Sequence, residues 1–327
     1  MEQVRKRNWW KVVAIVLVIV FVCCLALQGC GKVLENIANS PSVPNNYYKT
    51  VKTNGTLEAK YMAMGEHEVE YLESYAAMSF EKYEIHYPAD IANMDGPLPV
   101  VIFVNGTGCI GTKYMALQKH MASWGFITVA TDEKHAWNGF SAEMCVRFLQ
   151  RLNTLKVFNK KDNALYDKID VDNIGVTGHS QGGYGVVNAI TDQHHAASYK
   201  AAVSLSSCPS MDDCDFMWTA DPSQIKIPFL IIGSTGPIDA VIASMEGLQR
   251  FYDSIPDGVD KVLTRRNGAD HGQMLYYADG YVTAWFMYYL QGNTEAGNAF
   301  FGENAEILTN PLYQDQKSNQ YQSSQHD

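Results

Sequence analysis

The chain has 327 residues, of which 46% are hydrophobic and 18% are charged, and its net charge at pH 7 is -10. This composition is typical of a folded globular protein, and the length is sufficient for one α/β domain with a substantial core. An acidic balance argues against nucleic acid as a partner and favours solubility. Outside the extreme N-terminus, the sequence has no basic segment interleaved with aromatic residues and no internal repeat.

Residues 1–30 have the pattern of a targeting segment. A positive cluster that includes Arg5 and Lys11 precedes an apolar run at 12–27, which suits a signal peptide because a membrane-spanning helix needs about twenty residues. Cys30 ends a Leu-Gln-Gly-Cys sequence similar to a bacterial lipobox, so we predict a lipidated cysteine there. An uncleaved membrane anchor and an ordinary cleaved signal peptide are the alternatives. All three options place the domain outside the cytoplasm. Lipidation and an uncleaved anchor would also attach it to the membrane.

Residues 31–50 are rich in Asn, Ser and Pro and are predicted to form a tether. From residue 51 onward, predicted strands alternate with predicted helices. Strands are expected at 57–63, 80–87, 98–104, 126–131, 173–177, 201–205, 228–232 and 261–265, and helices at 113–123, 142–158, 183–191, 242–253 and 275–291. The alternation predicts an α/β domain over 51–308, with a mostly parallel central sheet and helices on both faces. Residues 309–327 are polar and glutamine-rich and are expected to be a disordered tail.

The sequence Gly-His-Ser-Gln-Gly at 178–182 follows one predicted strand and precedes a predicted helix. It matches G-x-S-x-G, which in this strand, turn and helix context predicts a nucleophile elbow. Such a turn strains the serine backbone, so the neighbouring positions must be small, as the two glycines are. Ser180 is therefore the predicted nucleophile, and the backbone amide of Gln181 is predicted to donate to a developing oxyanion.

A serine hydroxyl needs a base, and His271 is the preferred candidate among nine histidines. It lies in a glycine-rich loop between the last predicted strand and the last predicted helix. Asp239, in the loop after the strand at 228–232, is the predicted acid that orients the imidazole, and Asp213 and Asp215 are alternatives. The order serine, acid, histidine is that of α/β-hydrolases and differs from the two serine-protease orders.

Two further features belong to the same expected edge of the sheet. Gly-Thr-Gly at 106–108 follows an apolar strand and permits close backbone approach, so the second oxyanion donor is predicted to be the amide of Thr107 or Gly108. Trp137 and Trp218 lie in loops after strands and are candidates for the wall of a substrate pocket. Packing between loops is the alternative for both tryptophans.

Cysteine usage agrees with export, because four cysteines lie beyond the targeting segment and an even number permits disulfides. Cys208 and Cys214 flank a short polar loop and are the expected pair, since a bridge would restrict that loop in the unfolded chain. Pairing of Cys109 with Cys145 is left open. None of the four has Cys-x-x-Cys spacing, so no metal site is expected.

Together these motifs resemble the α/β-hydrolase superfamily, and within it the branch of cutinases, polyester hydrolases and dienelactone-hydrolase-like enzymes. The resemblance extends over about 53–302 and is carried by 101–108, 178–183, the loop with Asp239 and 268–271. It implies an α/β-hydrolase fold without a large lid domain, oxyanion donation by the amides of Thr107 and Gln181, and an aromatic wall at Trp218. Polyester hydrolases usually carry an aromatic residue near the Thr107 position and a methionine at the Gln181 position, and this chain has neither.

The sequence therefore predicts a serine hydrolase that cleaves carboxylic esters outside the membrane through a Ser180, His271 and Asp239 triad and an acyl-enzyme. The expected substrate is a small or lipid-like ester, and the expected assembly is a monomer. No cofactor, metal ion or nucleic acid is needed. A catalytically silent cell-surface binding module on the same fold is one alternative, and a peptidase or acyltransferase with the same triad is another.

Overall fold

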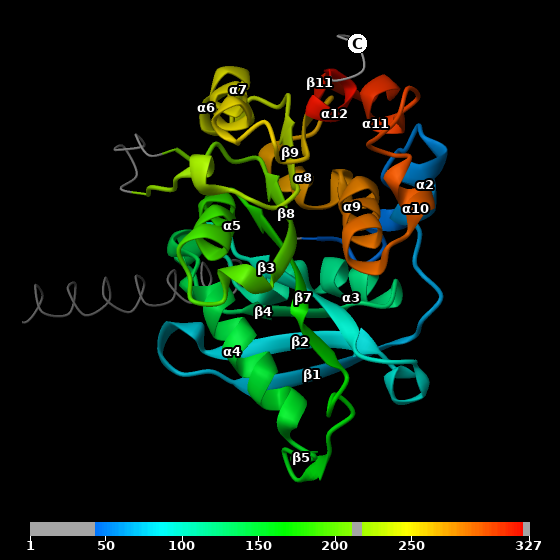
Figure 1. Ribbon diagram of the computed structural model, residues 1–327, viewed down its shortest axis with the longest axis vertical. Helices are drawn as coiled ribbons and strands as arrows, with labels where there is room; N and C mark the ends of the chain where they lie inside the picture. The colour runs from blue at the N-terminus through cyan, green and yellow to red at the C-terminus, as the bar shows by residue number, and fades with distance from the viewer. Residues whose placement is uncertain (1–42, 211–217, 323–327) are drawn as a thin grey trace, which may run out of the picture. The chain divides into compact units, whose positions relative to one another are not determined.

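The computed structural model describes residues 43–210 and 218–322 (Figure 1). The predicted targeting segment, with its lipidation site Cys30, lies outside the described residues, and so does Cys214. Within the described ranges, no helix is both long and apolar enough to cross a lipid bilayer.

In the described residues, nine strands form one sheet in the order β1-β2-β4-β3-β7-β8-β9-β10-β11. The strands are β1 (Val69–Tyr75), β2 (Lys82–Pro88), β3 (Leu98–Val104), β4 (Ile127–Thr131), β7 (Ile169–His179), β8 (Tyr199–Leu205), β9 (Phe229–Ser234), β10 (Lys261–Arg266) and β11 (Tyr313–Ser318). The strands from β4 to β10 in this order are parallel to their neighbours, whereas β1, β2 and β11 pair antiparallel at the edges. The predicted mostly parallel sheet is confirmed. A short hairpin of β5 (Val157–Phe158) and β6 (Lys161–Asp162) stands apart from it.

Strand β3 shows why both faces of the sheet are covered. Every residue of this strand is buried. Val100 and Ile102 pack into one hydrophobic cluster, and Val101 and Phe103 pack into a second. Because successive side chains of a strand point to opposite faces, a continuous apolar run requires a layer of helices on each side.

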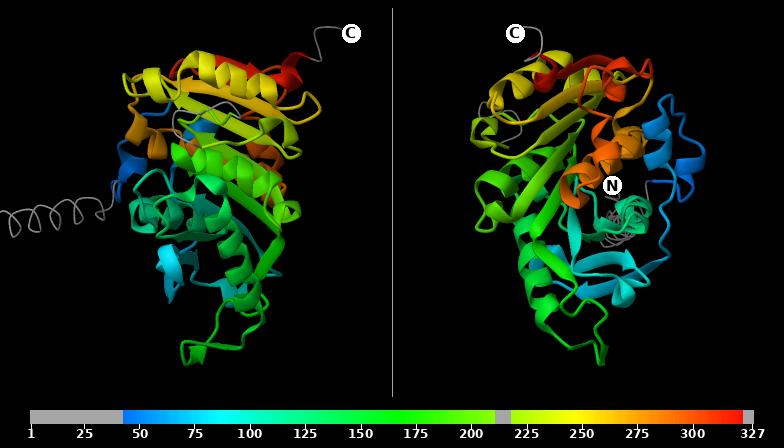
Figure 2. Two further views of the ribbon diagram at one scale, coloured as in Figure 1. Left: turned by 90° about the vertical axis from the view of Figure 1, so that its left-hand side faces the viewer. Right: turned by 45° about the vertical axis from the view of Figure 1, so that its right-hand side comes forward.

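Helices form those two layers (Figure 2). The first cluster contains residues of α4 (Phe140–Thr154), α5 (Gln181–Thr191) and α7 (Met245–Ser254), and the second contains residues of α3 (Met115–Ser123) and α9 (Asp279–Gln291). Shorter helices complete the described part of the domain: α2 (Thr56–Met62), α6 (Asp239–Ile242), α8 (Met274–Tyr277), α10 (Thr294–Gly297), α11 (Glu306–Thr309) and α12 (Asn319–Gln322). No large lid domain is present in the described ranges, as expected.

Both ends of the predicted domain need correction. Residues 43–50, predicted as tether, belong to the fold, because Val43 and Tyr47 are 2% and 0% exposed and lie in the second cluster. The predicted disordered tail contains β11, whose Tyr313 is buried. The Tyr313 hydroxyl donates a hydrogen bond to the buried carboxylate of Glu58 at 2.8 Å. The composition suggested disorder because β11 is a polar strand at the edge of the sheet. The residues that hold it in place, on β10 and at Glu58, lie far away in the sequence.

The segment 57–63, predicted as a strand, forms helix α2 instead. Its Tyr61 and Met62 are buried in the second cluster, and the helix packs against α9. The run is too short for its periodicity to distinguish a strand from a helix, and tertiary packing decided between them.

A buried ion pair joins α3 to the start of α9. Nδ1 of His120 lies 2.7 Å from a carboxylate oxygen of Asp279, and the two side chains are 0% and 3% exposed. The Tyr47 hydroxyl donates to the same carboxylate oxygen, and Nε2 of His120 lies 2.8 Å from the carbonyl oxygen of Ala63. Burial alone would lower the pKa of His120, but the charge of Asp279 and the hydrogen bonds raise it above 6.5.

We expect His120→Gln to lower the free energy of unfolding more at about pH 5.5 than at about pH 9. A histidine whose pKa is higher in the folded than in the unfolded state contributes its full stability below the unfolded value, and this contribution is lost as the pH rises through the folded value. Urea denaturation of both proteins at each pH measures the difference. A penalty that is equal at both pH values, or larger at the higher one, would show that the pair is not charged.

Candidate active site

Ser180 lies at the sharp turn between β7 and α5. Its φ of 57° and ψ of -124° fall where residues with a side chain are uncommon, as a nucleophile elbow requires. The flanking glycines are needed for close packing. A Cβ on Gly182 would lie 2.2 Å from the carbonyl oxygen of Val104, and one on Gly178 would lie 2.3 Å from the carbonyl oxygen of Gly182. Gly178 is therefore required by the turn itself, and Gly182 is required by the packing of the turn against the end of β3.

His271 and Asp239 meet although they lie on different segments. His271 begins the 3-10 turn His271–Gln273 after β10, and Asp239 is the first residue of α6 after β9. Nδ1 of His271 lies 2.5 Å from Oδ1 of Asp239, and Asp239 is 0% exposed. The structure thus places Asp239 at the ring of His271. The alternative acids Asp213 and Asp215 lie outside the described residues.

The other carboxylate oxygen of Asp239 has two donors. Oδ2 accepts a hydrogen bond from the backbone N–H of Ser234 at 2.8 Å and from the hydroxyl of Ser206 at 2.5 Å. Burial alone would raise the pKa of Asp239, but the hydrogen bonds from His271, Ser206 and Ser234 lower it to about 2. The group is therefore an oriented carboxylate at neutral pH.

Asp270, next to the histidine, bonds to the backbone of the loop and not to the imidazole ring. Its Oδ1 accepts a hydrogen bond from the backbone N–H of His271 at 2.8 Å, and its own N–H donates to Oε1 of Gln273 at 2.9 Å. Asp270 and Gln273 form a capping box at the start of the turn. Asp270 thus fixes the backbone that carries His271, while Asp239 contacts the ring.

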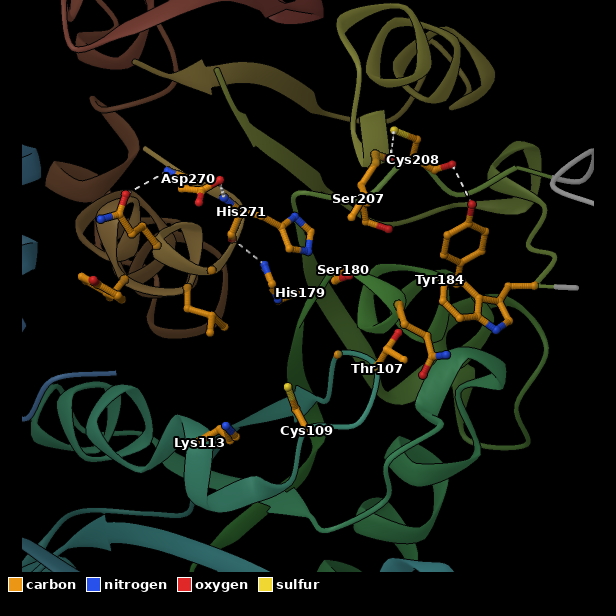
Figure 3. Close-up of a pocket in the computed structure, with 18 residues that line it drawn as sticks. Thr107, Cys109, Lys113, His179, Ser180, Tyr184, Ser207, Cys208, Asp270 and His271 are labelled. Carbon is orange, nitrogen blue, oxygen red and sulfur yellow. Dashed lines mark hydrogen bonds between the residues drawn. The ribbon is translucent and has the colours of Figure 1, made fainter. Parts of the chain in front are cut away.

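Ser180 and His271 open onto a cavity of about 810 Å³ (Figure 3). The imidazole of His271 lies beside Ser180 in this view. Asp239 is not among the lining residues and sits behind the histidine. The apolar part of the wall is formed by Tyr184, Trp218, Ile242, Leu275 and Tyr276. The cavity therefore combines one reactive edge with a largely apolar wall.

Two backbone amides at this edge have no acceptor within the described part of the chain. Among the residues that the structure describes, neither the N–H of Thr107 nor that of Gln181 makes a hydrogen bond. The neighbouring amides are engaged: the Gly106 N–H donates to the Tyr114 hydroxyl, and the Gly108 N–H donates to the carbonyl of Lys134, both at 2.9 Å. Of the two candidates on this loop, Thr107 is the one left available to an oxyanion.

Sequence reasoning missed His179, although its place beside the nucleophile was a signal. The residue lines the cavity, and its Nε2–H donates to the backbone carbonyl of His271 at 2.8 Å. The two imidazole rings lie 4.5 Å apart between centroids. Burial lowers the pKa of His179 to about 3, so the ring is neutral. His179 therefore braces the loop of the candidate base from inside the elbow.

Of the two tryptophans proposed for the pocket wall, one lines the cavity and the other does not. Trp218 lines the cavity and meets Tyr184 edge-on at 5.9 Å between ring centroids. Trp137 is not among the lining residues, contrary to expectation. It lies half-buried against the core on a short turn that packs on α5, where its carbonyl accepts a hydrogen bond from Asn188. For Trp137 the packing alternative is the better description.

Cys208 also lines the cavity, but its predicted partner Cys214 lies outside the described residues, so that disulfide stays a prediction. Cys109 and Cys145 are free thiols and do not pair with each other.

One group of side chains in the described ranges has ligand atoms close enough for a metal ion: Glu143, His194 and His195, within 4.8 Å of one another. The group lies away from the cavity. The Glu143 carboxylate already accepts hydrogen bonds from Arg147 at 2.7 Å and from His195 at 2.9 Å. These contacts satisfy the buried carboxylate as part of an ion-pair network with the partly exposed Arg147 and His195.

Residues 45–316 match the profile of a family described as PETase, PET hydrolase-like. Over 200 residues the chain is 26% identical to bis(hydroxyethyl) terephthalate hydrolase of Streptomyces coelicolor, covering 61% of this chain and 57% of that protein. It is 26% identical over 191 residues to cutinase est1 of Thermobifida alba, covering 57% and 56%. It is 24% identical over 203 residues to cutinase 2 of Thermobifida cellulosilytica, covering 60% and 68%. The matched segment spans little more than half the length of the first two relatives.

Proposed function

This chain belongs to the PET hydrolase-like family, and we propose on that basis that it is a serine esterase with Ser180 as nucleophile. The observation that carries the proposal is the contact of 2.5 Å between His271 and the buried Asp239, with the imidazole on the same cavity as a serine in a strained turn (Figure 3). A neutral imidazole held by a carboxylate can take the proton of a serine hydroxyl as that hydroxyl attacks.

In the acylation half, Oγ of Ser180 attacks the ester carbonyl carbon while Nε2 of His271 takes the hydroxyl proton. Negative charge develops on the carbonyl oxygen, where the N–H groups of Thr107 and Gln181 donate hydrogen bonds. Asp239 keeps the remaining ring proton on Nδ1 and stabilises the imidazolium. The intermediate collapses to an acyl-enzyme, and the alcohol leaves with the proton from His271.

In the deacylation half, His271 takes a proton from water, and the resulting hydroxide attacks the acyl carbon. The same two amides stabilise the second oxyanion. The carboxylic acid leaves, and Ser180 regains its proton from His271. Every group returns to its starting protonation state, so the cycle needs nothing beyond the ester and water.

The cavity supports an ester with an apolar acyl or alcohol part as substrate. About 810 Å³ lies within the range of pockets that enclose a small organic molecule, and the wall contains Tyr184, Trp218 and Leu275. The relatives are named for bis(hydroxyethyl) terephthalate and as cutinases. We propose that esters of this apolar kind, aromatic or long-chain, are the substrates of this chain as well.

The proposal includes action outside the cytoplasm. The N-terminal pattern supports export, with lipidation at Cys30 as the preferred attachment to the membrane. A bridge between Cys208 and Cys214 is compatible with an oxidising compartment and would brace a loop beside the cavity.

We expect a fluorophosphonate probe to label the protein at one site, Ser180, because an activated serine attacks phosphorus as it attacks an ester carbonyl. Mass spectrometry of the peptide that contains the elbow measures the adduct. Ser180→Ala is the control and should take up no probe. A protein that stays unlabelled would be a silent binding module on this fold, while cleavage of amides in preference to matched esters would indicate a peptidase.

A further inference from the structure

We propose that Ser206 is a positioning residue that holds the carboxylate of Asp239 in the orientation that the triad needs. The inference rests on the esterase function proposed above. Ser206 follows the last residue of β8 and is 0% exposed. Its hydroxyl donates to Oδ2 of Asp239 at 2.5 Å, and the Ser234 amide donates to the same oxygen at 2.8 Å. Among the described residues, His271 is then the one partner of Oδ1.

The backbone at Ser206 departs from strand geometry. Its φ is +49°, a left-handed conformation that is uncommon for a residue with a side chain, and its N–H donates to the carbonyl of Ile232 at 2.8 Å. The chain therefore turns at the end of β8 while it is still bonded to β9. Strained residues of this kind concentrate at functional sites, where the surrounding structure holds them in place.

The acid needs such a brace because its own element is weakly held. Asp239 begins the four-residue helix α6, whose apolar side chains face solvent: Val241 is 84% exposed and Ile242 is 43% exposed, and the preceding Ile238 is 46% exposed. A short helix with little apolar burial contributes little to fixing its first residue. The hydrogen bonds from Ser206, directly after β8, and from Ser234, at the end of β9, therefore fix the orientation of Asp239, which the packing of α6 does not.

Neighbouring serines provide an internal comparison. Ser204 and Ser207 are also buried, at 0% and 2% exposed, but their hydroxyls have no hydrogen-bond partner within the described residues. Ser206, between them, is the one whose hydroxyl donates to the candidate acid. Replacement of Ser204 therefore removes the same atom from the same strand region without touching Asp239.

The first test compares the kinetics of Ser206→Ala and Ser204→Ala with p-nitrophenyl butyrate as substrate. The concentration of active enzyme in each preparation is measured from the burst of p-nitrophenol in the first turnover. We expect Ser206→Ala to lower kcat roughly tenfold with KM within about twofold, because a hydrogen bond to a charged group is lost. Ser204→Ala should stay within about twofold of the wild type. Equal kinetics for the two variants would overturn the proposal.

The second test asks whether Ser206 acts through Asp239. In an Asp239→Asn background, adding Ser206→Ala should change kcat by less than about twofold, because the Ser234 amide still fixes the asparagine oxygen and no carboxylate faces His271. A further tenfold loss would mean that Ser206 acts on another group, and would overturn the proposed role.

Ser206→Gly is a second variant that lacks the hydroxyl, and glycine accepts the positive φ at this position. It should lose activity to the same extent as Ser206→Ala, and it replaces that variant if the alanine protein does not fold. Full activity in the glycine variant would assign the effect to the backbone.

These outcomes are separate from the proposed esterase function. If Ser180→Ala keeps its activity, the triad itself is wrong. If Ser180→Ala is inactive but the double-mutant cycle is additive, only the role of Ser206 fails.

Discussion

We expect Ser180→Ala to lower kcat/KM for p-nitrophenyl butyrate by roughly 10⁴-fold or more, with the remaining activity close to background. The variant lacks the nucleophile, while the oxyanion amides and the cavity wall stay in place. Because φ at this position is +57°, alanine meets about the same backbone strain as serine does. Steady-state hydrolysis with purified protein measures the loss.

The fold of the Ser180→Ala variant serves as the control. Its melting temperature should stay within a few degrees of the wild type, because Ser180 lines the cavity and belongs to neither of the two hydrophobic clusters of the described residues. An unchanged rate of ester hydrolysis in a folded variant would exclude the acyl-enzyme route. A lower rate accompanied by unfolding would call for Ser180→Cys, which keeps a nucleophile at the elbow and should still be acylated.

We expect Asp239→Asn to lower kcat roughly 10⁴-fold while KM changes little. Two donors, the Ser206 hydroxyl and the Ser234 amide, point at one oxygen of this side chain. An asparagine must present its carbonyl oxygen to both of them, which turns its NH₂ group toward Nδ1 of His271. That nitrogen must then accept, so the ring proton moves to Nε2, and the imidazole can no longer take the proton of Ser180.

Asp270→Asn is the comparison that distinguishes the two acids beside His271. Asparagine keeps a side-chain oxygen for the backbone N–H of His271, so the loss should be far smaller than for Asp239→Asn. The same kinetic assay on both variants decides the assignment. A larger loss at Asp270 than at Asp239 would transfer the role of the acid to Asp270.

Much of the fold could be predicted because its signals are local. The apolar run at 98–104 forms β3 with those bounds, and the elbow motif lies between a strand and a helix as expected. Short segments were less certain. Helix α2 and strand β11 were both missed, because neither has enough residues for a clear period and each is held by partners far away along the chain.

The sequence by itself determined the nucleophile candidate, because the G-x-S-x-G motif lies between a strand and a helix in one continuous segment, and it determined the order of serine, acid and histidine. The tertiary structure alone decided that Asp239 reaches His271 from 32 residues away, that Ser206 holds its other oxygen, and that Trp137 stays out of the cavity. The elbow can be recognised locally because the strained residue Ser180 and the close contact between Gly178 and Gly182 lie within five residues of the chain. Contacts between loops depend instead on where parallel strands end in space, and that is set by the packing of the whole sheet.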